Sequence, residues 1–198
     1  MYKRVVVAVL VSAASCGDDG GSVNPDAPGG GGGGGGGSDG GNNPGAGEPA
    51  NLTGITAAHN AVRAMVQTSP ALQPMTWNTQ LAATAAAWVA MCKDTDGNGL
   101  IDHNANRSVG HPYYVGENVF GGSGNVTAQQ AVDLWASEKA SYNYANNSCS
   151  GVCGHYTQIV WRTSVELGCA MGTCPSLQYK NVVVCNYGPG GNSGGKPY

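Results

Sequence analysis

A run of nine glycines at residues 29–37 divides this chain into two parts with different capacities to fold. Residues 17–50 hold 16 of the 33 glycines and contain no Lys or Arg. Such a segment cannot bury enough apolar surface to offset the entropy lost on ordering, so we expect a flexible tether there. The remaining residues, 51–198, have the length of one ordinary domain.

The first residues have the pattern of an export signal. Lys3 and Arg4 form a basic start, and residues 5–14 are an apolar run that leads through small residues to Cys16. This ending resembles the lipoprotein box of bacteria, in which the cysteine is lipidated and becomes the first mature residue. We therefore expect a lipoprotein-type signal peptide at 1–15, a lipidated Cys16 with the tether at 16–50, and an exported envelope domain at 51–198. The alternative is an ordinary signal peptide and a secreted product.

The cysteine content agrees with export. Seven cysteines are an odd number, but six remain once Cys16 is set aside. Six cysteines in an exported domain indicate disulfides rather than thiol chemistry or zinc binding by cysteine. They allow fifteen pairings, and sequence spacing alone does not choose among them.

The domain carries little charge and no charge bias. Residues 51–198 contain seven basic and seven acidic side chains. A neutral domain offers no basic stripe for phosphates, which argues against a nucleic-acid partner. No apolar run reaches the roughly 20 residues needed to span a bilayer. We expect a monomer that meets the membrane through its lipid anchor.

Apolar spacing predicts three helices followed by a pair of strands. The first helix covers residues 55–66, Asn78 caps the second, and a capping box of Thr127 and Gln130 starts the third. Two apolar, β-rich runs at 165–171 and 181–187 surround Cys169 and Cys185, as in a strand pair. Helices first and strands later indicate an α+β domain built in layers.

Two of the helical stripes contain a residue that does not fit an apolar face. His59 lies on the stripe of the first helix, and Glu138 lies on that of the third. A lone histidine on such a face is more often a satisfied core residue than a ligand, whereas a buried carboxylate needs a partner or a raised pKa. The two side chains could bind each other or together face a functional cleft.

Two longer motifs carry a family resemblance. Residues 154–162, GHYTQIVWR, resemble the G-H-Y-T-Q-x-V-W signature of the CAP superfamily, which comprises cysteine-rich secretory proteins, insect venom antigens and plant pathogenesis-related proteins. Residues 184–189, VCNYGP, resemble its second signature, C-N-Y-x-P. Shorter family marks follow the expected order: His59-Asn60-x-x-Arg63, Trp77-Asn78, Gly116-Glu117-Asn118 and Trp135-x-x-Glu138. The resemblance covers residues 55–198 and is nearest to the plant branch.

The resemblance implies a fold, a disulfide pattern and a site. The family fold is a three-layer α-β-α sandwich. Its plant-type disulfides carry over as Cys92–Cys174, Cys149–Cys153 and Cys169–Cys185. Its cleft tetrad carries over as His59, Glu117, Glu138 and His155, so the two residues that do not fit their helical stripes are half of that site. Two imidazoles and two carboxylates in a cleft can hold zinc or another divalent cation.

One segment departs from the plant pattern and resembles the opening of a calcium loop. Asp94, Asp96, Asn98 and Asp102 stand at loop positions 1, 3, 5 and 9, with the Leu100 carbonyl at position 7 and a glycine at position 6. Position 12, normally a bidentate Glu, is an alanine. The alternative is an exposed turn rich in Asp, Asn and Gly, which would have the same composition.

The resemblance also implies binding of sterols or related apolar lipids. Tyr142 and Tyr144 lie in a segment that resembles the family's lipid-contacting loop. The few charges of the domain and its many aromatic residues suit such a ligand, although most aromatic residues would fill the core in any case.

Two other functions compete with lipid binding. The first is a metal-dependent or acid–base hydrolase, peptidase-like, that uses the tetrad, with Ser108, Ser123 or Thr157 as a nucleophile by proximity alone. The second is a surface adhesion or toxin-like module whose partner is a protein. The chain has no H-E-x-x-H motif and no complete G-x-S-x-G motif, which favours binding over catalysis.

Overall fold

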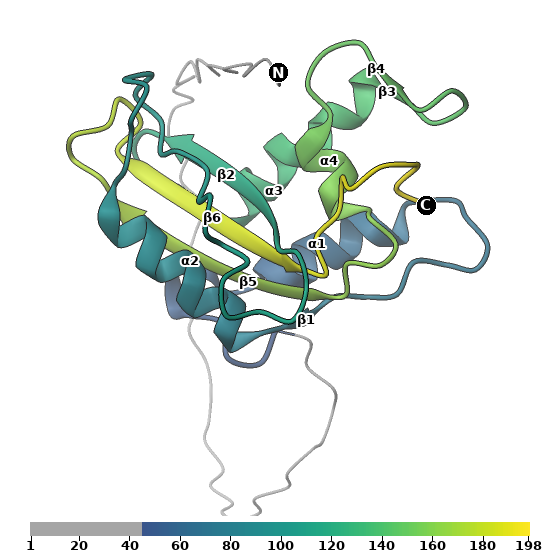
Figure 1. The fold of residues 1–198 in the computed structure, drawn as a ribbon, viewed down its shortest axis with the longest axis horizontal. Coiled ribbons are helices and arrows are strands. Elements are labelled where there is room, and N and C mark those ends of the chain that lie inside the picture. The colour runs from purple at the N-terminus through teal and green to yellow at the C-terminus, as the bar shows by residue number, and fades with distance from the viewer. Residues whose placement is uncertain (1–44) are drawn as a thin grey trace, which may run out of the picture. The chain divides into compact units, whose positions relative to one another are not determined.

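A computed structural model of the protein describes residues 45–198 (Figure 1). The helices are α1 (Ile55–Ala64), α2 (Thr79–Met91), α3 (Ala128–Ser137) and α4 (Gly154–Ile159), with short 3-10 turns η1 (Ala50–Leu52) and η2 (Glu138–Ser141). The strands are β1 (Thr76–Trp77), β2 (Gly116–Gly122), β3 (Tyr142–Asn143), β4 (Ser148–Cys149), β5 (Glu166–Thr173) and β6 (Asn181–Gly188). The predicted signal peptide, Cys16 and the tether up to residue 44 lie outside the described residues.

The main sheet is built around β6. Its strand order is β1-β5-β6-β2. β5 and β6 pair antiparallel with Cys169 opposite Cys185, which confirms the predicted strand pair. β2 pairs antiparallel with the other edge of β6, and β1 pairs in parallel with β5. A separate ladder joins β3 to β4. β6 is therefore hydrogen-bonded to a neighbouring strand on both edges.

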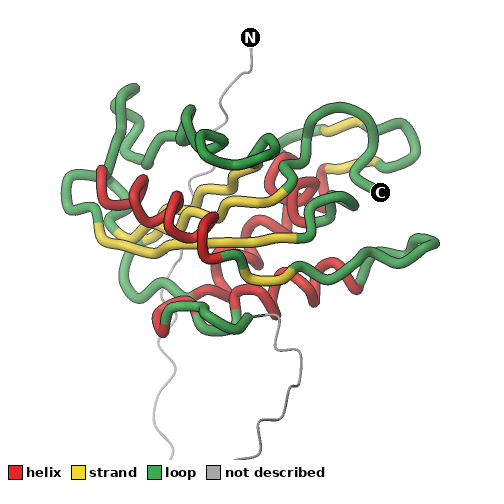
Figure 2. Tube along the Cα trace, turned by 60° about the horizontal axis from the view of Figure 1, so that its bottom comes forward, coloured by secondary structure: helices red, strands yellow, loops and turns green. Residues whose placement is uncertain are grey.

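Both faces of this sheet are buried, because alternate side chains of its strands enter two hydrophobic clusters. Val183 and Cys185 pack in the cluster formed with α1, α3 and α4. Val182 and Val184 pack in the cluster formed with α2. In Figures 1 and 2, α2 lies on one side of the strands and the other three helices lie on the opposite side. The predicted three-layer α-β-α sandwich is confirmed.

The helices begin where their caps predict, but two of them end early. Asn78 Oδ1 accepts two backbone N–H groups at the start of α2, and Thr127 and Gln130 form the capping box of α3. α1 ends at Ala64, ahead of the predicted residue 66, and α3 ends at Ser137. The apolar stripe of the third helix therefore continues into η2, where the helix tightens.

Residues 45–50, which the predicted tether included, contact the domain. The Glu48 carboxylate accepts hydrogen bonds from the backbone N–H groups of Gly54 (2.7 Å) and Thr56 (2.8 Å) at the start of α1. A carboxylate is stabilised at a helix N-terminus by the free N–H groups and by the helix dipole. The described domain therefore includes Glu48 as well as residues 51–198.

The three disulfides have the pairing that the family resemblance implied. They are Cys92–Cys174, Cys149–Cys153 and Cys169–Cys185. Cys92–Cys174 ties the end of α2 to the residue after β5, across a sequence separation of 82. Because it closes the longest loop, chain-entropy arguments give it the largest stabilisation of the three, about 4 kcal/mol.

A glycine on β5 allows α2 to approach the sheet, and this contact gives the first prediction. A Cβ at Gly168 would lie 2.2 Å from the backbone N of Ala82 and 2.5 Å from the carbonyl O of Asn78. Since backbone atoms cannot move aside cheaply, Gly168→Ala should lower the free energy of unfolding by about 1–3 kcal/mol. Gly154→Ala is the control, because its Cβ would meet nothing nearer than Asn192 Nδ2 at 4.0 Å. Denaturant unfolding measures both variants, and equal midpoints would contradict this account.

Candidate functional site

His59 is a residue of the core. It lies on α1, is fully buried, and both ring nitrogens have protein partners. Nδ1 bonds the Ile55 carbonyl O (2.8 Å), and Nε2 bonds the Tyr187 hydroxyl (2.9 Å). Burial lowers the pKa of His59 to about 4, against the opposing effect of the Ile55 hydrogen bond, so the imidazole is neutral at pH 7. The predicted role of His59 as a metal ligand in the cleft is wrong in this structure, because neither nitrogen is available.

Glu138 and His155 form a first histidine–carboxylate pair. Oε1 of Glu138, the first residue of η2, accepts a hydrogen bond from His155 Nδ1 (2.5 Å). Its Oε2 accepts the backbone N–H groups of His155 (2.9 Å) and Tyr156 (3.2 Å), which lie in the first turn of α4 and lack helical partners. The Trp135 ring stacks on His155, with ring centroids 6.2 Å apart. Glu138, which did not fit the apolar stripe of the third helix, therefore binds the start of α4.

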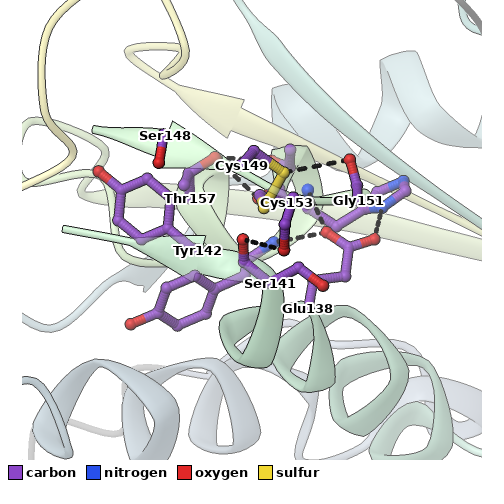
Figure 3. Close-up of a disulfide and its surroundings, with 12 residues drawn as sticks. Glu138, Ser141, Tyr142, Ser148, Cys149, Gly151, Cys153 and Thr157 are labelled. Atoms are coloured by element: carbon purple, nitrogen blue, oxygen red, sulfur yellow. Dashed lines mark hydrogen bonds and ion pairs between the residues drawn. A yellow bond between two sulfur atoms is a disulfide. The ribbon is translucent and has the colours of Figure 1, made fainter. Parts of the chain in front are cut away.

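The Cys149–Cys153 disulfide lies near Glu138 (Figure 3). Cys153 directly precedes α4, and Cys149 belongs to β4, whose partner β3 follows η2. The disulfide and the β3–β4 ladder therefore close the chain between η2 and α4. This closure helps to hold Glu138 against His155, although the two residues are 17 positions apart.

His103 and Glu117 form a second pair. Glu117 lies on β2 with a fully buried side chain, and the His103 side chain, in the loop before it, is 58% exposed. Glu117 Oε1 accepts hydrogen bonds from His103 Nδ1 (2.7 Å) and from the backbone N–H of Asn104 (2.9 Å). Because a carboxylate only accepts, the Nδ1 of His103 carries a proton. His103 occupies the place beside Glu117 that we expected for His59.

Sequence reasoning missed His103 because it follows the acidic segment in a loop without apolar periodicity. One usable signal was its position shortly before the Gly116-Glu117-Asn118 mark. The other was the general tendency of a histidine on an apolar helix face, such as His59, to be a core residue.

Asn118 follows Glu117 on β2 and binds the segment of the other pair. Its Nδ2 donates to the His155 carbonyl O (3.1 Å) and to the Tyr187 hydroxyl (2.9 Å), so it links β2 to both α4 and β6. We call His103, Glu117, Glu138 and His155 the paired site. In each pair the histidine Nδ1 faces a carboxylate, and within residues 45–198 no group hydrogen-bonds to either Nε2. Metal-binding histidines have this arrangement, in which the carboxylate fixes the tautomer and the ring orientation.

The acidic segment 94–102 forms a compact loop, which we call the acidic loop. Ligand oxygens of Asp94, Asp96 and Asp102 lie within 4.8 Å of one another, and no other group of three or more His, Cys, Asp or Glu ligand atoms in the described part of the chain is gathered this closely. Asp94 accepts the backbone N–H groups of Asn98 (3.1 Å) and Gly99 (2.9 Å). Gly99, at position 6 of the predicted calcium loop, has a left-handed φ of 80°. The loop therefore makes the sharp turn that the pattern requires.

The two tyrosines predicted to contact lipid lie at the β3–β4 hairpin in different surroundings. Tyr142 packs beside Tyr156, with ring centroids 6.2 Å apart. Tyr144 is 40% exposed and stacks on Tyr198, with centroids 4.6 Å apart and planes 3° from parallel. Lys196 Nζ lies 4.4 Å from the centroid of the Tyr144 ring. Tyr144 is therefore the more accessible ring, and the C-terminal residues cover part of it.

The hydroxyls considered as nucleophiles have no histidine partner among the hydrogen bonds of the described residues. Ser108 Oγ accepts the backbone N–H of Val115 (2.9 Å). Thr157 Oγ1 donates to the Cys153 carbonyl O (2.9 Å). Ser123 is exposed in the bend after β2. The hydrogen bonds of Ser108 and Thr157 support the local backbone.

Comparison with known proteins agrees with the motifs. The profile of the Cysteine-rich secretory protein family (CAP) matches residues 56–187. Pathogenesis-related protein 1 of Arabidopsis thaliana is 44% identical over 141 residues, which cover 71% of this chain and 78% of the relative. Schistosoma mansoni venom allergen-like protein 4 has a TM-score of 0.62 at 28% identity, covering 76% of this chain and 95% of the other. A crystal structure of NaASP2 with Zn²⁺ has a TM-score of 0.52 at 25% identity, covering 73% and 82%. This chain therefore belongs to the cysteine-rich secretory protein (CAP) family.

Proposed function

We propose that this chain is an exported CAP-domain binding protein that holds zinc or a similar divalent cation at the paired site. The observation that carries this proposal is the hydrogen bonding of the two ring nitrogens of His103 and His155. Each is bonded through Nδ1 to a carboxylate, and each Nε2 is left without a hydrogen-bond partner in the described domain. The Zn²⁺ present with NaASP2, a protein of similar fold, supports the same chemistry here. Three disulfides are typical of proteins exported to an oxidising compartment.

The donor atoms of the paired site suit zinc. Neutral imidazole nitrogen is a common zinc ligand, and a carboxylate behind the ring raises its basicity and fixes its orientation. His103 and His155 would hold the ion, and Glu117 and Glu138 would orient them. Two protein ligands leave coordination positions for water or a bound ligand, which the ion would polarise as a Lewis acid.

Cys16 would carry a lipid anchor, as the apolar run and small residues before it indicate. Residues 45–198 contain no helix with the length and apolar character needed to cross a bilayer.

Zinc binding should depend on both histidines of the paired site. Titration of the full chain with zinc should perturb the ring signals of His103 and His155 in NMR spectra. Replacing either residue with Ala should weaken the affinity measured by calorimetry at least about tenfold, because a direct ligand is lost. Glu117→Gln and Glu138→Gln should weaken it by about 10–100-fold, the usual effect of losing a residue that orients a ligand.

His111→Ala is the matched control for zinc binding. His111 is bonded to Thr84 Oγ1 (3.0 Å) on α2 and is not a member of the paired site, so its loss should leave the affinity unchanged. Binding that survives without His103 and His155 but disappears without His111 would place the metal elsewhere.

We also propose that a sterol-like or other apolar ligand contacts the β3–β4 hairpin. The exposed Tyr144 ring supports this, because an aromatic side chain that is partly accessible offers apolar area to a lipid. Tyr144 is covered in part by Tyr198 and Lys196, so a ligand at this ring would displace those contacts.

Tyr142→Ala combined with Tyr144→Ala should weaken lipid capture by about 1–3 kcal/mol, because apolar contact area is lost. A fluorescent sterol or fatty acid titrated into the full chain measures the change. Tyr114→Ala is the control, since Tyr114 is exposed but is bonded to Arg107 and lies outside the hairpin. If the double variant binds lipid as tightly as the unaltered chain, a protein partner would be favoured instead.

The acidic loop would bind calcium through Asp94, Asp96, Asn98, Leu100 and Asp102. Its gathered carboxylates and the left-handed Gly99 support this. Because position 12 is Ala105, the dissociation constant should lie near the weak range of extracellular modules, about 10⁻⁴–10⁻³ M.

Calcium at about 10 mM should therefore raise the melting temperature by about 3–10 °C, by preferential binding to the folded state. Asp94→Ala combined with Asp96→Ala should abolish the rise, which differential scanning fluorimetry measures. Asp133→Ala should keep it, because Asp133 is bonded to Gln129 on the surface of α3. If the unaltered chain shows no rise, the segment is only a turn.

A further inference from the structure

Asn186 lies on β6 directly opposite Glu117 on β2. Residues opposite each other in an antiparallel pair project from the same face of the sheet. Here that face carries α2, and both Asn186 and the Glu117 side chain are fully buried. A polar residue buried beside a buried carboxylate must supply or receive hydrogen bonds, since burial without them is costly.

The side-chain amide of Asn186 has one orientation that satisfies both of its ends. With Nδ2 toward Glu117, it donates to Oε2 (3.3 Å), and its Oδ1 accepts the backbone N–H of Ala85 on α2 (3.3 Å). Turned the other way, the amide oxygen faces the carboxylate and the NH₂ group faces another N–H, which leaves a contact to the Leu81 carbonyl O (3.3 Å). Two acceptors face to face in a buried site are unfavourable, so the first orientation holds.

We propose that Asn186 is a positioning residue of the paired site, an inference that rests on the function proposed above. Oε1 of Glu117 receives His103 Nδ1–H and the Asn104 N–H, and Oε2 receives Asn186. The His103 side chain is 58% exposed, whereas Asn186 is fixed between β6 and α2. Of the two side chains that donate to Glu117, Asn186 is therefore the fixed one, and it sets the orientation of Oε2.

The support reaches His103 through the carboxylate. If Oε2 lost its donor, the buried Glu117 side chain would rotate toward another donor, because a buried carboxylate oxygen without a hydrogen bond is unfavourable. Oε1 would then no longer hold the Nδ1–H of His103. Asn186 thereby keeps His103 in the tautomer that leaves Nε2 for a ligand.

Asn186→Asp tests this directly, because it exchanges the donor NH₂ for an acceptor of nearly the same shape. We expect the ring ¹⁵N signals of His103, recorded on the full chain without metal, to lose the signature of a single Nδ1-protonated tautomer. The zinc affinity should fall by about 10–100-fold. Unchanged His103 ring signals in a folded Asn186→Asp variant would overturn the proposal.

Asn118→Asp is the matched control. This variant makes the same chemical change at the residue next to Glu117. Asn118 donates hydrogen bonds to the His155 carbonyl O and to the Tyr187 hydroxyl, and within residues 45–198 it has no hydrogen bond to His103. The His103 ring signals should therefore stay as in the unaltered chain. A loss equal to that of Asn186→Asp would show a general disturbance of the sheet and overturn the specific role of Asn186.

A double variant keeps the test decisive if Asn186→Asp does not fold. Glu117→Gln places an amide opposite the new carboxylate, so the combined variant regains a donor–acceptor pair and should recover most of the lost stability. A double variant as unstable as the single one would show that Asn186 does not act through Glu117. If the unaltered chain binds no zinc, the proposed metal site fails, while the ring signals and the double variant still decide the role of Asn186.

Discussion

The burial of β5 and β6 on both faces is the constraint on which the rest of the domain depends. Alternate residues of β6 enter two separate cores, one under α2 and one under α1, α3 and α4. The Cys169–Cys185 disulfide cross-links the two strands at the centre of this pair. A strand covered on both sides must be almost wholly apolar, so the few polar side chains that it carries have to be hydrogen-bonded.

Asn186 and Tyr187 are the two polar residues that β6 carries at its buried end, and alternation sends them to opposite faces. Tyr187 bonds His59 and Asn118 on the side of the three helices. Asn186 faces Glu117 on the side of α2. The same strand thus supports both histidine–carboxylate pairs, one through Asn118 and α4 and the other through Glu117.

Most of the few carboxylates in this domain lie at the two candidate binding sites. Two of the seven acidic residues of 51–198 belong to the paired site, and three lie in the acidic loop. The buried carboxylate of Glu117 is tolerated because three groups donate to it. The partly buried carboxylate of Glu138 accepts hydrogen bonds from an imidazole and from two backbone N–H groups of α4. His59, which has no carboxylate, is neutral instead. Pairing and neutrality are the two ways in which a buried ionisable group avoids an uncompensated charge.

The sequence by itself determined the helix starts, the β5–β6 pair and the family, because each of these is encoded locally. Asn78 caps α2 by accepting hydrogen bonds from residues within three positions of it. The apolar pattern of each strand and the two longer family motifs are continuous runs of residues. The tertiary structure alone decided which partner each ionisable side chain has. Periodicity correctly placed His59 on a buried face, yet the hydroxyl that binds it is 128 residues away, and His103 reaches Glu117 from a loop with no pattern. A local pattern reports that a side chain is buried, whereas its hydrogen-bond partner depends on which distant segments the sheet brings within about 3 Å.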